Sequence, residues 1–285
     1  MKTYTSYGSC QADGLAQILN AVPEFAAEWQ YMQVPACFDM SLEQLNSYSD
    51  DTIKNVDLFL HQPISPNHHG VEFSTEYLRT NVATNATHIS FQYLHWEGDS
   101  PTFNDPHGLP AHPLGYVDSL VAQAVLDGKS LQTFLDKLSL ANQYLADNVS
   151  EIGAWGVDQL RSREGGDNDG HRPIDVTATD FIAETWENEH LFYTMNHPSK
   201  APLWHVAAKV LERLGYDPST VDVSKLPDPL SLTILPTYKK PGASEFYEEQ
   251  FEWFSEKPKD DVANFVDRLA ESRFWIKGSY NHAFN

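Results

Sequence analysis

The chain contains little cysteine and no long apolar run. Only Cys10 and Cys37 occur among its 285 residues, which is too few for the disulfide framework of a small secreted protein and fits a reducing compartment. No apolar stretch approaches the roughly 20 residues that a membrane span needs. The N-terminal sequence MKTYTSYGSC also lacks the apolar segment of a signal peptide. We therefore expect a cytoplasmic protein without a membrane span.

Basic residues are scarce as well. The chain has 19 lysine and arginine residues against 40 aspartate and glutamate residues, and its formal net charge is −21. Such a charge disfavours nucleic acid and anionic lipid as partners, because both are polyanions. A phosphorylated ligand would need a local group of cations, so the few arginines become informative.

The order of the predicted elements indicates an α/β protein, which we interpret as one domain over residues 1–285. Thr- and Tyr-containing or apolar runs predict strands, and the segments between the first four of them have helical periodicity or helix caps. Alternating strands and helices favour βα crossovers and a mostly parallel sheet in the N-terminal half. The predicted strands are 2–7, 31–34, 55–60, 87–96 and 191–195.

The C-terminal half is predicted to be rich in helices. Apolar residues recur there at helical spacing, and a Pro-rich connector over 226–241 precedes two acidic, aromatic helices near the C-terminus. The predicted helices before that connector are 114–127, 130–147, 150–163, 180–189 and a long one through 203–214.

Polar residues follow the predicted strands at the point where each one ends. Ligands of open parallel sheets bind beyond the carboxyl ends of the strands, so these residues are candidates for a functional site. One nucleophile and three imidazoles would then share one edge of the sheet. The residues are Ser9, Cys10 and Gln11 after the first strand, His61 and Gln62 after the third, His95 after the fourth, and Asn196 and His197 after the last.

Cys10 stands where the strand period changes to a helical period. At a helix N-terminus, unsatisfied backbone donors and the helix dipole stabilise a thiolate, so we expect a lowered pKa for this thiol. Backbone N–H groups around Gln11 could bind the oxyanion of an acyl-transfer intermediate. The alternative is that Cys10 is a small buried apolar residue, as we expect for Cys37. The histidines show no HExxH or comparable ligand spacing, and we predict no metal site.

The segment GSCQADGL at 8–15 resembles the N-terminal GNCQ-type motif of the WcbI family of polysaccharide-biosynthesis enzymes, with Ser9 in place of the usual Asn. Further blocks match in order, so that the resemblance extends over residues 4–215, whereas the connector and helices of 216–285 have no counterpart in it. Those blocks are DLFLHQPIS (57–65), FSTEYL (73–78), LRSRE (160–164), DVTATDFI (175–182) and LFYTMNHPS (191–199).

The resemblance implies a CoA-dependent acyltransferase, an acetyltransferase that moves an acetyl group from acetyl-CoA to a saccharide or related hydroxyl. Cys10 would be the nucleophile or an acyl-positioning thiol, and His197 or His61 the general base. Gln11 would help to bind the oxyanion, and Asn196 belongs to the same candidate catalytic set.

Coenzyme A would be bound by Ser9 and Gln62 near the thiol and by arginines at its phosphates. Guanidinium groups bind phosphate in a fork geometry, and the candidates are Arg79, Arg161, Arg163 and Arg172. The Gly-rich loop from Arg161 to Pro173 is predicted to be a mobile lid over bound coenzyme A, or else a surface loop without ligand contact.

Two other functions remain open at this point. A strand, a Gly-x-nucleophile turn and a helix also present the serine of SGNH-type esterases, so Cys10 could serve an acyl-ester hydrolase with water as the acceptor. The same pocket could also belong to a non-catalytic module that binds coenzyme A or another nucleotide.

Overall fold

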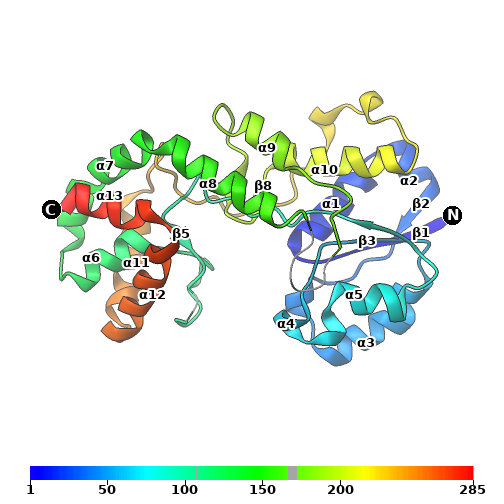
Figure 1. Cartoon of the computed structure of the whole chain (residues 1–285), viewed down its shortest axis with the longest axis horizontal. Coiled ribbons are helices and arrows are strands. Elements are labelled where there is room, and N and C mark those ends of the chain that lie inside the picture. The colour runs from blue at the N-terminus through cyan, green and yellow to red at the C-terminus, as the bar shows by residue number, and fades with distance from the viewer. Residues whose placement is uncertain (107, 166–171, 285) are drawn as a thin grey trace. The chain divides into compact units, whose positions relative to one another are not determined.

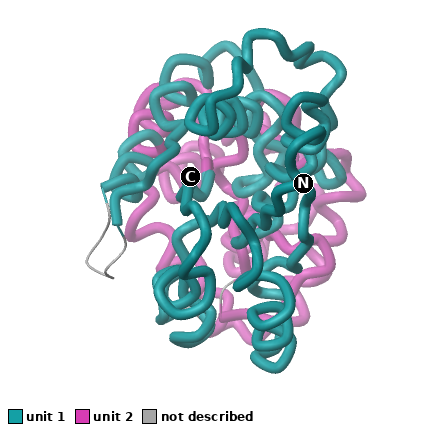
Figure 2. The backbone as a smooth tube through the Cα atoms, turned by 90° about the vertical axis from the view of Figure 1, so that its right-hand side faces the viewer, with its two compact units in different colours: residues 1–95, 157–233 teal, residues 96–156, 234–285 magenta. Residues whose placement is uncertain are grey.

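The computed structural model describes residues 1–106, 108–165 and 172–284, without the side chain of His68. The described chain divides into two compact units, each built from two separate stretches of chain (Figure 2). Unit 1 contains residues 1–95 and 157–233, and unit 2 contains residues 96–156 and 234–285. Among the helices of the described ranges, none is long and apolar enough to cross a membrane.

A four-stranded parallel sheet organises unit 1, which confirms the predicted α/β class. Its order is β2-β1-β3-β4, so the two central strands are flanked on both sides and are the most buried. Tyr7 at the end of β1 pairs with His61 at the end of β3, and His61 pairs with Ser90 at the end of β4. The strands are β1 (Lys2–Tyr7), β2 (Trp29–Tyr31), β3 (Leu58–His61) and β4 (Thr87–Ser90).

Helices cover both faces of this sheet, as Figure 1 shows with α1 and α10 on one side and α3 and α5 on the other. Leu15 and Leu19 of α1 are fully buried, and α1 packs against α10. The predicted capping box of α3 is present, with Ser41 and Gln44 each binding the other's backbone N–H. The α-helices of unit 1 are α1 (Cys10–Asn20), α2 (Pro23–Glu28), α3 (Leu42–Asp51), α4 (Pro66–His69), α5 (Thr75–Tyr77), α9 (Thr179–Thr185) and α10 (Lys200–Arg213).

Several strand predictions were wrong in extent or partner. The strands predicted over 31–34 and 55–60 are displaced, because β2 spans Trp29–Tyr31 and β3 spans Leu58–His61. The strand predicted over 87–96 ends at Ser90, because the next residues pair with Val176 in place of a neighbouring strand. The run predicted over 191–195 does not join the parallel sheet. It forms β7 (Phe192–Thr194), which pairs with β8 (His197–Pro198) across a tight turn and satisfies its backbone groups there.

Unit 2 is helical apart from one short strand pair, as predicted for the C-terminal half. The helix predicted from residue 114 begins at Ser119, because Val117 and Asp118 pair as strand β6 with β5. Within the described residues, three helices follow the connector, and not the two predicted. The elements are β5 (Phe103–Asn104), β6 (Val117–Asp118), α6 (Ser119–Leu126), α7 (Leu131–Asp147), α8 (Val149–Ser162, which continues into unit 1), α11 (Ser244–Ser255), α12 (Lys259–Ser272) and α13 (Phe274–Phe284).

Candidate functional site

The turn between β1 and α1 places Cys10 at the first residue of a helix, as predicted. Ser9 is the N-cap, and its hydroxyl oxygen accepts a hydrogen bond from the Gln11 backbone N–H at 3.3 Å. Gly8 has a φ of +156°, and a Cβ there would lie 2.5 Å from the Oε1 atom of Gln62. Glycine is therefore required at this position, because Gln62 occupies the space of a side chain.

A buried hydrogen-bond network holds this turn. The backbone N–H and the hydroxyl of Ser9 both donate to Gln62 Oε1, each at 2.8 Å. Gln62 Nε2 donates to Gln11 Oε1 at 2.9 Å. Gln11 Nε2 donates to the carbonyls of Leu94 at 2.6 Å and Asn196 at 2.7 Å, and Gln11 Oε1 also accepts from the Leu94 N–H at 3.0 Å. Gln11 thus joins α1 to two segments that are remote in sequence.

These bonds occupy every hydrogen-bonding group of the Gln11 side-chain amide. It is 1% exposed, both of its amide hydrogens are donated, and its oxygen accepts two bonds. It has no hydrogen left for an oxyanion, so in this arrangement the side chain positions the turn. His95 and His197 each directly follow a residue whose carbonyl binds Gln11, which brings both imidazole-bearing segments to the start of α1.

The pKa of Cys10 differs from the expected direction. Burial raises the pKa of the Cys10 thiol above its ordinary value, although the Gln11 N–H and the Ser9 hydroxyl favour the thiolate. Desolvation therefore outweighs the donors of the helix N-terminus. Cys37 is 2% exposed, as expected of a buried apolar residue, and burial raises its pKa to about 11. Its backbone N–H donates to the Gly8 carbonyl at 2.8 Å, so it lies beside the same turn.

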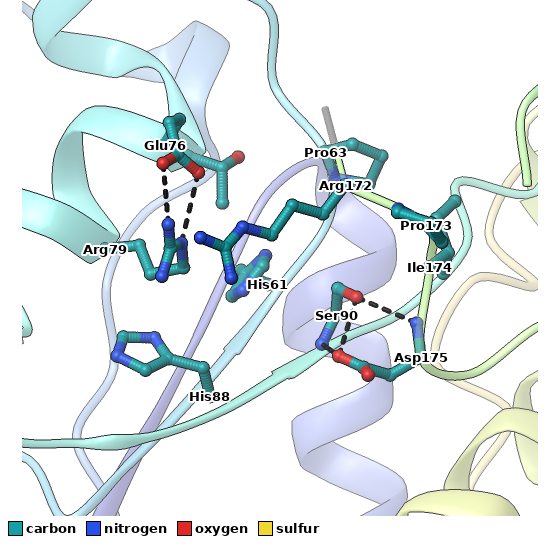
Figure 3. Close-up of a pocket in the computed structure, with 11 residues that line it drawn as sticks. His61, Pro63, Glu76, Arg79, His88, Ser90, Arg172, Pro173, Ile174 and Asp175 are labelled. Atoms are coloured by element: carbon teal, nitrogen blue, oxygen red, sulfur yellow. Dashed lines mark hydrogen bonds and ion pairs between the residues drawn. The ribbon is translucent and has the colours of Figure 1, made fainter. Parts of the chain in front are cut away.

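A cavity of about 240 Å³ opens beyond the ends of β3 and β4 (Figure 3). His61 lies at its base, and its Nδ1 atom is buried without a hydrogen-bond partner among the described residues. Burial lowers the pKa of His61 to about 3, so the imidazole is neutral at physiological pH. The cavity is lined by His61, Pro63, Thr75, Glu76, Arg79, His88, Ser90, Arg172, Pro173, Ile174 and Asp175.

Two arginines face this cavity. Arg79 donates from Nε at 3.1 Å and from Nη2 at 2.6 Å to the carboxylate of Glu76, and this bond lowers the pKa of Glu76. The guanidinium of Arg172 points into the space between Arg79 and His61 (Figure 3). The Asp175 carboxylate accepts from the backbone N–H of Ser90 at 2.9 Å and from its hydroxyl at 2.8 Å.

The other predicted residues lie outside this cavity. Arg161 pairs with Asp180 at 3.3 Å on an exposed surface, and Arg163 does not line the cavity. The end of α8 nevertheless adjoins the sheet edge, because Gln92 Nε2 donates to the Leu160 carbonyl at 3.1 Å. The middle of the predicted lid, residues 166–171, lies outside the described residues. Burial lowers the pKa of His197, which stands in β8.

Several cavity residues were missed by sequence reasoning. His88 and Ser90 alternate along β4, which is the spacing of residues on one face of a strand, and Glu76 precedes Arg79 by one helical turn. These two spacings in the sequence could have identified His88, Ser90 and Glu76 as candidate site residues. Within the described part of the chain, no cluster of three or more His, Cys, Asp or Glu side chains could hold a metal ion.

Comparisons with known proteins give one family and one close structure. A family model described as "Polysaccharide biosynthesis enzyme WcbI" matches residues 6–219. A solved structure of WcbI, described as a novel polysaccharide biosynthesis enzyme, is 39% identical with a TM-score of 0.92 and covers 100% of this chain and 99% of its own. That structure is further described as the native protein without a disulfide bond between coenzyme A and one of its cysteines. Among curated proteins, none matches the chain.

Gly8→Ala should destabilise the protein more than an ordinary positive-φ glycine substitution. The new Cβ would collide with Gln62 and displace the bonds to Ser9, at a cost of about 2 kcal/mol or more. Gly128→Ala is the matched control, since its φ is +65° and no atom lies within 4 Å of the added Cβ. It should lose about 1 kcal/mol. Urea unfolding measures both, and equal losses would contradict the role given to Gly8.

Cys10 should be alkylated faster than Cys37 at neutral pH, by about tenfold or more, because Cys37 is more buried and its thiolate is scarcer. Since the Cys10 pKa is raised, its rate should increase about tenfold per pH unit below that pKa. Peptide mapping after brief iodoacetamide treatment measures both rates, and urea-unfolded protein provides the reference. Faster labelling of Cys37 in the folded protein would refute the accessible position of Cys10.

Proposed function

The chain belongs to the WcbI family of polysaccharide biosynthesis enzymes, and from this premise we propose that it is a CoA-dependent acyltransferase that moves an acetyl group from acetyl-CoA to a saccharide hydroxyl. The observation that carries the proposal is Cys10, a partly exposed thiol held at the carboxyl edge of the parallel sheet by the Gln11–Gln62 network. The description of the similar WcbI structure supports the involvement of coenzyme A, because it names coenzyme A together with one cysteine of that protein, although it states that no disulfide joins the two there.

The proposed reaction has two steps at Cys10. A general base takes the proton of the Cys10 thiol, and the thiolate attacks the acyl carbonyl of the thioester. A bond forms from the Cys10 sulfur to the acyl carbon, the bond to the CoA sulfur breaks, and the base returns its proton to that sulfur, so that CoA leaves as a thiol. The saccharide hydroxyl then attacks the acyl-Cys10 carbonyl and loses its proton to a general base. The new ester leaves, and the Cys10 thiol is restored by a proton from the same base.

His197 is the better candidate for that base. A thiol whose pKa is raised needs a nearby base to become a thiolate at neutral pH. His197 is kept neutral by burial and can accept a proton, and it follows Asn196, whose carbonyl is bound by Gln11. His61 is a weaker base, because its pKa is about 3.

The remaining predicted residues divide between the two ends of the CoA molecule. Ser9 and Gln62 shape the turn that would receive the thioester end, and Gln62 Nε2 keeps one hydrogen beyond its bond to Gln11. Arg161 and Arg163 are proposed to bind CoA phosphates, because they stand where α8 ends beside the sheet edge, whereas Arg79, predicted for the same role, faces the cavity. A protein of net charge −21 must bind such a polyanion through local cations.

Release of CoA from acetyl-CoA, measured with and without saccharide acceptors, tests the proposal. The wild-type protein should release CoA faster when an acceptor is present, and Cys10→Ser should lower that rate by roughly three orders of magnitude. Cys37→Ala is the matched control, because it removes the neighbouring thiol and should retain the rate.

The other outcomes of this assay separate the rival functions. Release that is independent of any acceptor would identify a hydrolase. Binding of CoA without release would identify a non-catalytic module. Full activity of Cys10→Ser would exclude covalent catalysis at Cys10.

A further inference from the structure

The cavity at the ends of β3 and β4 holds two arginines that the proposed chemistry at Cys10 does not use, together with the carboxylates of Glu76 and Asp175. Arg79 and Arg172 face it in a protein whose net charge is −21. The Arg79–Glu76 pair occupies Nε and Nη2 and fixes the orientation of the guanidinium, which leaves N–H groups on its other edge for a ligand. The Arg172 guanidinium points into the same space (Figure 3).

The other polar groups of the cavity show which part of it is open to a ligand. The Thr75 hydroxyl donates to the Gln62 carbonyl and accepts from the Ile64 N–H. The Ser90 hydroxyl is bound on both sides by Asp175. The His61 Nδ1 atom, in contrast, is buried and without a partner among the described residues, although a buried polar atom normally has one. The cavity therefore offers two guanidinium groups that can bind an anionic group and one neutral imidazole that can bind a hydroxyl.

We propose that this cavity binds the acceptor, and that the acceptor is a phosphorylated sugar whose phosphate lies between Arg79 and Arg172 and whose hydroxyl contacts His61. This inference rests on the proposed acyl transfer at Cys10 and adds the substrate class to it. Guanidinium groups bind phosphate through paired N–H···O bonds, and two of them can hold one phosphate from two sides.

The position of the cavity favours the acceptor over CoA as the source of the phosphate. Gln62 links the cavity to the turn at Cys10, because its carbonyl accepts from the hydroxyl of the cavity residue Thr75 and its side chain accepts from Ser9. The CoA thiol must reach Cys10, and the long pantetheine arm separates that thiol from the CoA phosphates. In a sugar phosphate, only one ring separates a hydroxyl from the phosphate, so its phosphate can lie in a cavity that adjoins the turn at Cys10.

The size of the cavity points the same way. At about 240 Å³ it is smaller than the roughly 300–1,000 Å³ of pockets that enclose drug-sized ligands. One sugar phosphate fits such a volume, whereas the nucleotide part of CoA needs more.

A phosphorylated acceptor sets the order of the reactions, because the acyl group is then added while the sugar still carries its phosphate. A sugar-phosphate-forming reaction supplies the substrate, and a nucleotidyl or glycosyl transfer consumes the product.

Calorimetry on the full chain tests this without turnover. The probes are mannose 1-phosphate, inorganic phosphate, mannose and CoA. Arg172→Gln changes an exposed side chain of the cavity, and Arg161→Gln is the matched control outside it. We expect Arg172→Gln to weaken the binding of mannose 1-phosphate by about tenfold or more and the binding of CoA by less than about twofold. Arg161→Gln should leave the affinity for mannose 1-phosphate unchanged.

Three results would overturn the proposal. They are no heat with mannose 1-phosphate, no tighter binding of mannose 1-phosphate than of inorganic phosphate, and a tenfold loss of CoA affinity in Arg172→Gln, which would make the cavity a CoA subsite. Selective sugar-phosphate binding in a protein that does not turn over acetyl-CoA would retain the phosphate site and refute the acyl transfer. The two proposals can therefore fail separately.

Discussion

The hydrogen bonds between the side-chain amides of Gln11 and Gln62 are the constraint on which the candidate site depends. Both side chains are buried, at 1% and 0% exposure, so each amide must find its partners inside the protein. Leaving one such group unpaired costs about 1–3 kcal/mol. The network therefore fixes the turn at Cys10, the segment after β4 and the turn between β7 and β8 relative to one another.

Burial keeps the titratable groups of the candidate site uncharged, although the chain as a whole is strongly acidic. The thiol lies where burial disfavours its ionisation, and the nearby imidazoles of His61 and His197 are kept neutral by the same cause. Neutral bases and a protonated thiol suit a reaction in which protons move during the chemical steps. The cations that line the cavity are Arg79 and Arg172, which suits the binding of phosphate groups.

Local features of this fold could be predicted from the sequence. The change from strand to helical period marks Cys10 as a helix start, and Ser41 with Gln44 specifies a capping box, because both signals act within a few residues. Features set by distant segments could not be predicted. Burial of Cys10 reverses the pKa shift expected at a helix N-terminus, and β7 pairs with its own continuation across a turn that the apolar pattern does not reveal.

The arginines illustrate the same limit at the candidate site. Nothing in the sequence separates Arg79 and Arg172, which share a cavity, from Arg161, which pairs with Asp180. The register of β3 with β4 brings His88 and Ser90 beside His61, and the bonds of Asp175 to Ser90 bring the segment at 172–175 to the same place. Nonlocal pairing thus decides which cations form a site.

Mass spectrometry of the acid-quenched protein after incubation with acetyl-CoA alone tests the central claim most directly. Without an acceptor, the second step is blocked and the acyl-enzyme should accumulate. The account predicts one acetyl group on the peptide that contains Cys10, and none on the peptide that contains Cys37. An unmodified Cys10 under saturating acetyl-CoA, or acetylation at Cys37 alone, would contradict it.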